Sequence, residues 1–409
     1  MTKRNRSKRL QAVVIVCAVC VVFGLMQGVH DNYGIMLNGL VARTGLDYAA
    51  VSFVIGVGAL LYGVAQPFMG MLALKKSNAF VMLLGIFLIA LGLIATPFSK
   101  NFVMLLLTFG IVLPVGTTGL ASGILMSAIT PLIGEKRSVL VSGILQASAG
   151  VGDALLAPGM ERFISLTGIA PTMIGLSVPF LIMIPIAVWI GRLNRRQMTD
   201  APASDAPAGK EDSLRGILSA AFRDRDYLCT LIGFSTCGFN MSIIESHLFS
   251  QFTASGIPGS VASLTLTVYG VTTMLGAILT GWLGSKFKMK NVLGATYAIR
   301  VAISACFLLL PKTVPFAFIM TGLLGMSGDS TVPPTMGTIS RKFGAKQLAV
   351  LYGFALVGHQ IGAFLSASLG GQFVKMGWGY TPLWIINLLL AAVAATASFM
   401  IREKKSTAM

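Results

Sequence analysis

Ionisable side chains are rare inside the long apolar stretches of this 409-residue sequence, and those present are the groups that could do chemistry. A charge at the centre of a membrane-length helix costs roughly 2.5 kcal/mol or more, so such groups mark functional sites by default. Carboxylates and imidazoles in that setting are suited to binding protons or solutes. The residues of this kind are His30, Asp31, Asp153, Glu245, His247, Arg300, Asp329 and His359.

Polar clusters occur near one end of two of these stretches. QGVHDNYG contains His30, Asp31 and Asn32, which step round a helix by about 100° each and so cannot all face one way. Glu245 and His247 form a similar cluster further along the chain. For both clusters, contact with a solute or a gate is one interpretation, and local capping or pairing is the other.

Two further candidates lie near the middle of their stretches. Asp153 follows the small residues of GILQASAGVG, which let helices approach closely, so its carboxyl is expected in a crowded site that can exchange a proton. His359, in GHQIG, could bind a carboxylate or relay a proton. The structural alternatives are an acid that only links helices and an imidazole bound to a backbone carbonyl. Neutral candidates for contact with a solute are Gln66, Gln146, Asn240, Tyr62 and Tyr269, the two tyrosines being equally interpretable as packing aromatics.

Arg300 lies about ten residues from either end of the apolar run NVLGATYAIRVAISACFLLL. Asp329 lies on the next run at an estimated depth that differs by under about 8 Å, which an arginine side chain can span. We expect a structural ion pair between the two side chains. Such a pair would fix the register of the two helices and add little to their stability. Direct contact with a substrate and a proton-linked switch are the alternatives.

The sequence carries none of the patterns of nucleotide-driven or hydrolytic chemistry. It has no G-x-x-x-x-G-K-[ST] loop, no His/Cys set with zinc spacing, and no Ser/His/Asp set outside the apolar stretches. We therefore expect no enzymatic activity, no cofactor and no metal. The five cysteines lie within or at the edge of apolar stretches, so no disulfide framework is predicted.

The apolar stretches predict membrane-spanning helices. Hydrophobic residues make up 55% of the chain, charged residues 11%, and the mean hydropathy is +0.81, whereas a soluble domain is about 25% charged. The expected fold class is an all-α polytopic membrane protein with twelve transmembrane helices. The predicted spans are 11–40, 46–73, 79–98, 102–133, 138–163, 170–192, 227–252, 260–285, 291–311, 314–340, 346–373 and 379–401.

The net charge of +17 is interpreted as an orientation signal. If both termini are cytoplasmic, the segments on that side carry 25 Lys and Arg and the outer loops carry five, which is the positive-inside distribution. This placement accounts for the basic residues without a nucleic-acid partner. The first apolar stretch is too long for a signal peptide and is expected to be an uncleaved helix.

The sequence contains an internal repeat with an offset of 210 residues, because the segment from Ile129 aligns without gaps on that from Ile339. A repeat this long predicts two six-helix bundles in parallel orientation, at 1–192 and 227–409, joined by a cytoplasmic linker at 193–226. The linker includes TDAPASDAPAGKEDS, whose composition cannot bury a core. The matched residues are Gly134, Gly143, Gly152 and Phe163 in the first copy and Gly344, Gly353, Gly362 and Phe373 in the second.

These features resemble the major facilitator superfamily over essentially the whole chain. The loop after the second predicted helix keeps Gly70 and Leu72 of the family motif G-x-L-x-D-R-x-G-R-[RK]. Leu74 and Lys75 replace its acid and its arginine, and the second copy has Ser285 in place of the acid. The acid helps to close the cytoplasmic gate in the family, so this detail of gating is expected to differ.

Within the superfamily, the stretches CGFNMSIIESHLFSQFTASGI, TVPPTMGTISRKFG and LYGFALVGHQIGAFLSASLGG resemble bacterial members of the monocarboxylate-porter-like branch. The resemblance implies a monomeric secondary transporter in the bacterial cytoplasmic (inner) membrane that moves a small organic anion by alternating access, with protons as a candidate symport ion. Relatives carry an anion-binding arginine in the eighth helix, and this chain has none there. The alternatives are a proton-coupled efflux transporter for drugs or other amphiphilic or cationic compounds, and a transporter-like membrane sensor.

Overall fold

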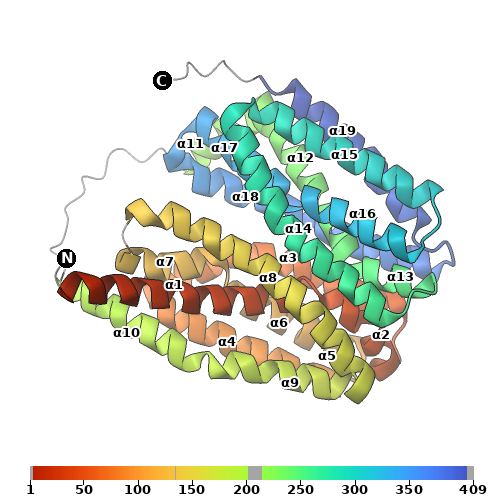
Figure 1. The fold of residues 1–409 in the computed structure, drawn as a ribbon, viewed down its shortest axis with the longest axis horizontal. Coiled ribbons are helices and arrows are strands. Elements are labelled where there is room, and N and C mark those ends of the chain that lie inside the picture. The colour runs from red at the N-terminus through yellow and green to blue at the C-terminus, as the bar shows by residue number, and fades with distance from the viewer. Residues whose placement is uncertain (1–2, 134, 201–213, 403–409) are drawn as a thin grey trace. The chain divides into compact units, whose positions relative to one another are not determined.

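The computed structural model describes residues 3–133, 135–200 and 214–402, and within them every regular element is helical (Figure 1). The chain divides into two compact units, Met1–Ala206 and Pro207–Met409, each a bundle of helices. The division falls inside the predicted linker. Residues 201–213 of that linker, and Gly134 of the repeat, lie outside the described residues.

The first unit contains the first six predicted spans. The helices of its second and third predicted spans begin at side-chain caps, since the Asp47 carboxylate accepts from Ala50 N at 2.7 Å and the Ser77 hydroxyl accepts from Phe80 N at 3.1 Å. The elements are α1 (Lys3–His30), α2 (Tyr33–Thr44), α3 (Tyr48–Lys75), α4 (Asn78–Ala95), η1 (Thr96–Phe98), α5 (Phe102–Leu105), η2 (Leu106–Val112), α6 (Leu113–Thr118), α7 (Ser122–Ile133), α8 (Glu135–Thr167), α9 (Ile169–Ile182) and α10 (Ile184–Asp200).

The second unit contains the other six. It opens on an amphipathic helix inside the predicted linker, where Ile217, Leu218 and Ala221 pack with Tyr227 and Leu351. That apolar contact explains why this part of the linker is ordered as a helix. The elements are α11 (Leu214–Arg223), α12 (Arg225–Ser242), η3 (Ile243–Leu248), α13 (Phe249–Ala254), α14 (Gly259–Lys286), α15 (Met289–Leu309), α16 (Val314–Ser327), η4 (Asp329–Thr331), α17 (Val332–Phe343), α18 (Ala345–Lys375) and α19 (Thr381–Met400).

Ten helical segments of the described chain are long and apolar enough to cross a membrane, and the all-α polytopic fold class is confirmed. The fifth and tenth predicted spans are not among these ten. In the fifth, the side chains of residues 134–140 lie outside the described part of the chain, and the rest of α8 contains Asp153 and several Gly and Ser residues. The tenth is divided into α16 and α17 by the short turn η4 at Asp329–Thr331.

Several predicted spans are not continuous helices. The first, predicted over 11–40, is broken because α1 ends at His30 and α2 begins at Tyr33. The Asn32 side chain donates to Gly28 O at 2.8 Å, and such side-chain bonds compete with helical ones. The fourth span is interrupted at residues 119–121, just after Pro114, and the tenth at 329–331, which are positions 210 residues apart. Broken helices are tolerated in membrane proteins where they line a cavity.

The internal repeat is visible in the packing of each unit. In the first unit, α1 lies against α8 (Figure 1). A Cβ at Gly152 on α8 would overlap the carbonyl group of Gly24 on α1. In the second, α12 lies against α18, and a Cβ at Gly362 would overlap the carbonyl oxygen of Ser235. Because Gly152 and Gly362 are repeat-related, the same close helix contact occurs once in each unit.

Candidate functional site

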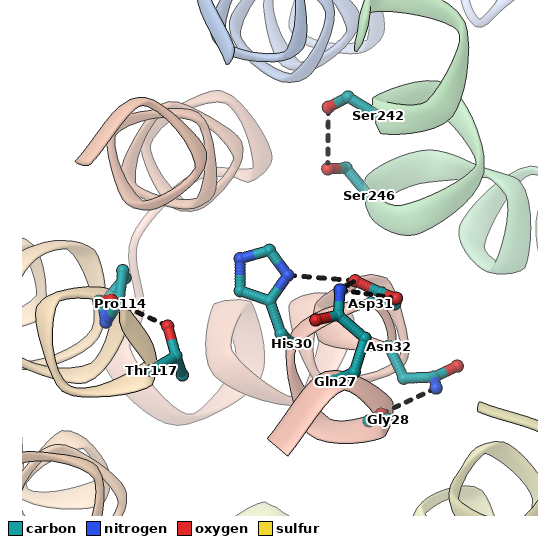
Figure 2. A network of polar contacts seen from close by, with 9 residues as sticks. All are labelled: Gln27, Gly28, His30, Asp31, Asn32, Pro114, Thr117, Ser242 and Ser246. Carbon is teal, nitrogen blue, oxygen red and sulfur yellow. Dashed lines mark hydrogen bonds and ion pairs between the residues drawn. The ribbon is translucent and has the colours of Figure 1, made fainter. Parts of the chain in front are cut away.

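The first polar cluster lies where α1 ends (Figure 2). Gln27 Nε2 donates to both carboxylate oxygens of Asp31, at 2.7 and 3.0 Å, and His30 Nδ1 lies 3.0 Å from Asp31 Oδ1. Asn32 instead bonds the backbone at Gly28. The structure therefore brings His30 and Asp31 together as an acid–imidazole pair and assigns Asn32 to the helix break.

His30 is buried, with 7% of its surface exposed, and its ring lies between two tyrosines. The ring centroid is 4.5 Å from that of Tyr62 and 5.2 Å from that of Tyr33. Within the described chain, His30 Nε2 has no hydrogen-bond partner, while Nδ1 faces the Asp31 carboxylate. An imidazole bonded to a carboxylate through one nitrogen can take up a proton and form a compensated ion pair, so the geometry is suited to reversible protonation.

In the second unit, Arg300 lies on α15 with 1% of its surface exposed. Its Nη2 donates to the carbonyl oxygens of Ser327 and Gly328, the latter at 2.8 Å. Helix α16 ends at Ser327, where carbonyl groups lose their intrahelical partners, so the guanidinium caps the broken helix. Asp329 follows these two residues directly. The ion pair predicted between the Arg300 and Asp329 side chains stays a prediction.

Two side chains, Tyr297 and Cys237, lie beside the Arg300 guanidinium, and two more lie beside Cys237. The Tyr297 ring centroid is 5.3 Å from Arg300 Cζ, within the range of a cation–π contact. The Cys237 thiol lies beside Arg300 and His359 and is 3.2 Å from Thr331 Oγ1. Among the described residues, Arg300 Nε and Nη1 have no hydrogen-bond partner. We call these five residues the Arg300 cluster, in which a buried positive charge lies against a thiol, an aromatic ring and two carbonyl oxygens.

Other predicted residues lie near these clusters. Asp153 is buried on α8, with 5% exposed, next to the close contact that Gly152 makes with α1. Asn240 is buried on α12 one turn after Cys237, and neither atom of its amide has a hydrogen-bond partner in the described chain. Tyr269 is buried on α14, where its hydroxyl would lie 3.2 Å from a Cβ at Gly328, so it borders the same helix break.

The remaining predicted residues are separate from both clusters. His247 is fully buried in the π-helix η3, and its Nε2 lies 3.0 Å from Ala367 O, which favours its structural interpretation. Glu245 lies half-buried in the same π-helix. Gln146 is exposed on α8, and Gln66 lines a hollow of about 270 Å³ in the first unit.

Four residues of the clusters were not predicted as site residues. They are Gln27, which holds Asp31, Cys237 and Tyr297, which lie beside Arg300, and Thr331, which lies beside Cys237. Helical spacing could have indicated two of them, because Gln27 is four residues before Asp31 and Tyr297 is three before Arg300. Cys237 and Thr331 come from other helices, and no local pattern in the sequence points to them.

The helices and buried polar clusters define a polytopic integral membrane protein. Residues 14–255 and 252–408 match the sequence profile of the Major Facilitator Superfamily. The chain therefore belongs to the Major Facilitator Superfamily, as its resemblance indicated.

Curated relatives are distant. The chain is 28% identical over 203 residues to an uncharacterized MFS-type transporter, YcxA, of Bacillus subtilis, covering 46% of this chain and 48% of that protein. It is 21% identical over 295 residues to monocarboxylate transporter 12 of Xenopus laevis, covering 66% of this chain and 63% of that protein. The match thus spans about half to three fifths of the length of these relatives.

Solved structures share the fold. A bacterial homolog of the human lysosomal transporter Spinster, in an inward-facing and unoccupied conformation, has a TM-score of 0.71 at 16% identity, covering 95% of this chain and 96% of that one. The Escherichia coli fucose:proton symporter FucP has a TM-score of 0.62 at 17% identity, covering 96% of this chain and all of that one. At these identities the likeness shows the fold alone.

Proposed function

We propose that this chain is a secondary active transporter of a small organic anion of the monocarboxylate kind. It works by alternating access, as a monomer in a bacterial inner membrane with both termini cytoplasmic, and it uses protons as the coupling ion. Membership of the superfamily supports transport rather than catalysis. The name of one relative, monocarboxylate transporter 12, supports the class of solute.

The observation that carries the proposal is the His30–Asp31 pair at the end of α1. Proton coupling needs a buried group whose charge can change during each cycle, and a carboxylate bonded to an imidazole is such a group. Gln27 holds the carboxylate from one turn earlier, so the pair is fixed in position. The helix break next to it supplies the irregular backbone that transporters use near their binding sites.

The choice of an anion over a cation depends on how the buried charges are compensated. The Asp31 carboxylate accepts hydrogen bonds from Gln27 and faces His30 Nδ1, so it has polar partners within its own helix. Arg300 donates to the neutral carbonyl oxygens of Ser327 and Gly328 and lies beside the Cys237 thiol. A buried positive charge of this kind attracts an anion and repels a cation.

Uptake into proteoliposomes tests the proposal. The full-length chain is reconstituted with an alkaline interior, labelled lactate is supplied outside, and in a parallel preparation labelled tetraphenylphosphonium is loaded inside. Protein-free liposomes are the control for passive permeation. Proton-driven accumulation of lactate supports the proposal. Extrusion of the organic cation instead indicates an exporter, and binding of lactate without flux indicates a sensor; either result contradicts the proposal.

An Asp153→Asn variant separates the two candidate proton carriers of the first unit. Asp153 is buried at the contact between α1 and α8, whereas Asp31 is bonded to His30. Normal accumulation by the Asp153 variant assigns the coupling proton to the His30–Asp31 pair. Loss of accumulation with retained lactate exchange assigns it to Asp153.

A further inference from the structure

The hollow in the first unit belongs to neither polar cluster. It has a volume of about 270 Å³ and is lined by residues of α3, α4, α6 and α7. At the volume that water takes up in the liquid, this space holds roughly nine waters, or one polar group of about ten non-hydrogen atoms. We call it the α3–α7 hollow, and its lining includes Gln66, Gly70 and Leu74 of α3, Asn78 of α4, and Gly123 and Ser127 of α7.

The hollow is open because small residues line it. A Cβ added at Gly70 or at Gly123 would meet no atom within 4 Å. Asn78 Nδ2 donates to Ser127 Oγ at 3.1 Å, which joins α4 to α7 beside the hollow. Protein interiors are close-packed, so a space of this size held open between bonded helices is suited to a ligand.

The polar groups of the hollow are neutral. Its ten lining residues, all in the described part of the chain, include no charged side chain. The amides of Gln66 and Asn78 and the hydroxyl of Ser127 offer both donors and acceptors of hydrogen bonds. Such a lining suits a ligand rich in hydroxyl and ester oxygens.

Two lysines add positive charge next to the hollow. Lys75 and Lys76 are exposed and directly follow the lining residue Leu74, which stands where the family motif has its acid. Among the residues that the structure describes, neither lysine forms an ion pair. The segment Tyr48–Lys75 is long and apolar enough to cross a membrane, so its lysine end lies at the level of the lipid headgroups.

An exposed apolar stripe runs along α3 from this end. Phe68, Met71 and Leu74 are 62%, 50% and 89% exposed, and their spacing of three residues places them on one side of the helix. A free phosphate would gain nothing from this stripe, whereas a phospholipid would bury its acyl chains against it.

We propose that the α3–α7 hollow binds the headgroup of an anionic phospholipid. Phosphatidylglycerol has the matching chemistry, because its phosphoglycerol group carries one negative charge and about ten non-hydrogen atoms. Its phosphate pairs with Lys75 and Lys76, and its glycerol hydroxyls bond Gln66, Asn78 and Ser127. The inference requires only that the chain spans a membrane, and it does not rest on the proposed transport of an anion.

Ligand-dependent thermal unfolding tests the site without any measurement of transport. The purified full-length chain in detergent is titrated with dioctanoyl phosphatidylglycerol, dioctanoyl phosphatidylcholine or glycerol 3-phosphate at equal ionic strength. A ligand that binds only the folded state raises Tm as its concentration exceeds Kd. We expect phosphatidylglycerol to raise Tm at concentrations at which phosphatidylcholine and glycerol 3-phosphate leave it unchanged.

Charge variants assign the preference to the two lysines. Lys75→Gln and Lys76→Gln should each weaken the apparent affinity for phosphatidylglycerol about fivefold, and the double variant about thirtyfold. Lys100→Gln is the matched control, since Lys100 is an exposed lysine of the same unit in the loop before α5. It should bind phosphatidylglycerol like the native chain.

Filling variants assign the binding to the hollow itself. Gly70→Leu and Gly123→Leu place a side chain in open space, so they should abolish the response to phosphatidylglycerol without lowering the Tm of the lipid-free chain. Gly159→Leu on α8 is the control, because its Cβ also meets no atom within 4 Å and Gly159 does not line the hollow.

Four results would overturn the site. They are no rise with phosphatidylglycerol, an equal rise with phosphatidylcholine, a rise unchanged in both filling variants, and an equal loss of affinity in Lys75→Gln and Lys100→Gln. An equal rise with glycerol 3-phosphate would also overturn it, because the ligand would then be a free phosphate ester. None of these results bears on lactate uptake, so failure of the lipid site and failure of the proposed transport are distinguishable.

Discussion

The close contact between α1 and α8 in the first unit, repeated between α12 and α18 in the second, gives a prediction with internal controls. A Cβ at Gly152 would lie 2.6 Å from the Gly24 carbonyl carbon and closer still to its oxygen, and both are backbone atoms that a rotamer change cannot move. Gly152→Ala therefore forces α1 and α8 apart. Overpacking of this kind costs about 1–3 kcal/mol. In a unit of this size we expect Tm to fall by roughly 2–10 °C.

The control lies on the same helix. A Cβ at Gly143 would meet no atom within 4 Å, so Gly143→Ala should leave Tm unchanged or raise it slightly. The repeat supplies the same comparison in the second unit, where Gly362→Ala should destabilise and Gly353→Ala should not. Thermal unfolding in detergent, followed by intrinsic fluorescence, measures all four variants. Equal Tm values for Gly152→Ala and Gly143→Ala would refute the reasoning.

Two further predictions concern charged groups. Asp31→Asn should abolish accumulation of lactate driven by a pH gradient while lactate exchange continues. The control variant Asp47→Asn, which keeps its helix cap, should accumulate lactate normally. Equal accumulation by the two variants would contradict the coupling assignment. Lys342→Gln should lower Tm by about 1–3 °C at pH 7 to 10, because Lys342 lies 2.8 Å from Asp224 Oδ1 and also bonds Asp226. Burial alone would lower the pKa of Lys342, but the two carboxylates raise it by more, so the pKa is raised overall. The stabilisation from this pairing is therefore full below the ordinary lysine pKa. It is lost only as the pH rises past the raised pKa. A Tm difference that vanished already at pH 9 would contradict this pairing.

The helical spans and the internal repeat were predictable because hydropathy and glycine spacing are local properties of the sequence. The fold class followed from them and is confirmed. The helix break at Asn32 was not predictable, since it depends on a side chain bonding a backbone carbonyl one turn earlier. The helix α11 was also missed, because its apolar face is short and its packing surface comes from α12 and α18.

The candidate site was only partly predictable for a related reason. Depth in the membrane identified Arg300, and the nearest acid along the chain, Asp329, was the natural partner to predict. The capping bonds of Arg300 go to the carbonyls of Ser327 and Gly328, which lose their intrahelical partners where the helix breaks, and the ion pair with Asp329 stays a prediction. His30 and Asp31 were predicted as a cluster, and their partner Gln27 follows from helical spacing once the carboxylate is known to be bonded.

Movement of protons driven by the solute tests the central claim most directly. Proteoliposomes containing the native chain and the pH dye pyranine are given an inward lactate gradient with no imposed pH difference, beside liposomes containing Asp31→Asn. The account predicts that the interior acidifies rapidly in liposomes that contain the native chain. In liposomes that contain Asp31→Asn it should acidify no faster than in protein-free liposomes. Lactate entry through the native chain without acidification beyond that of protein-free liposomes would contradict it.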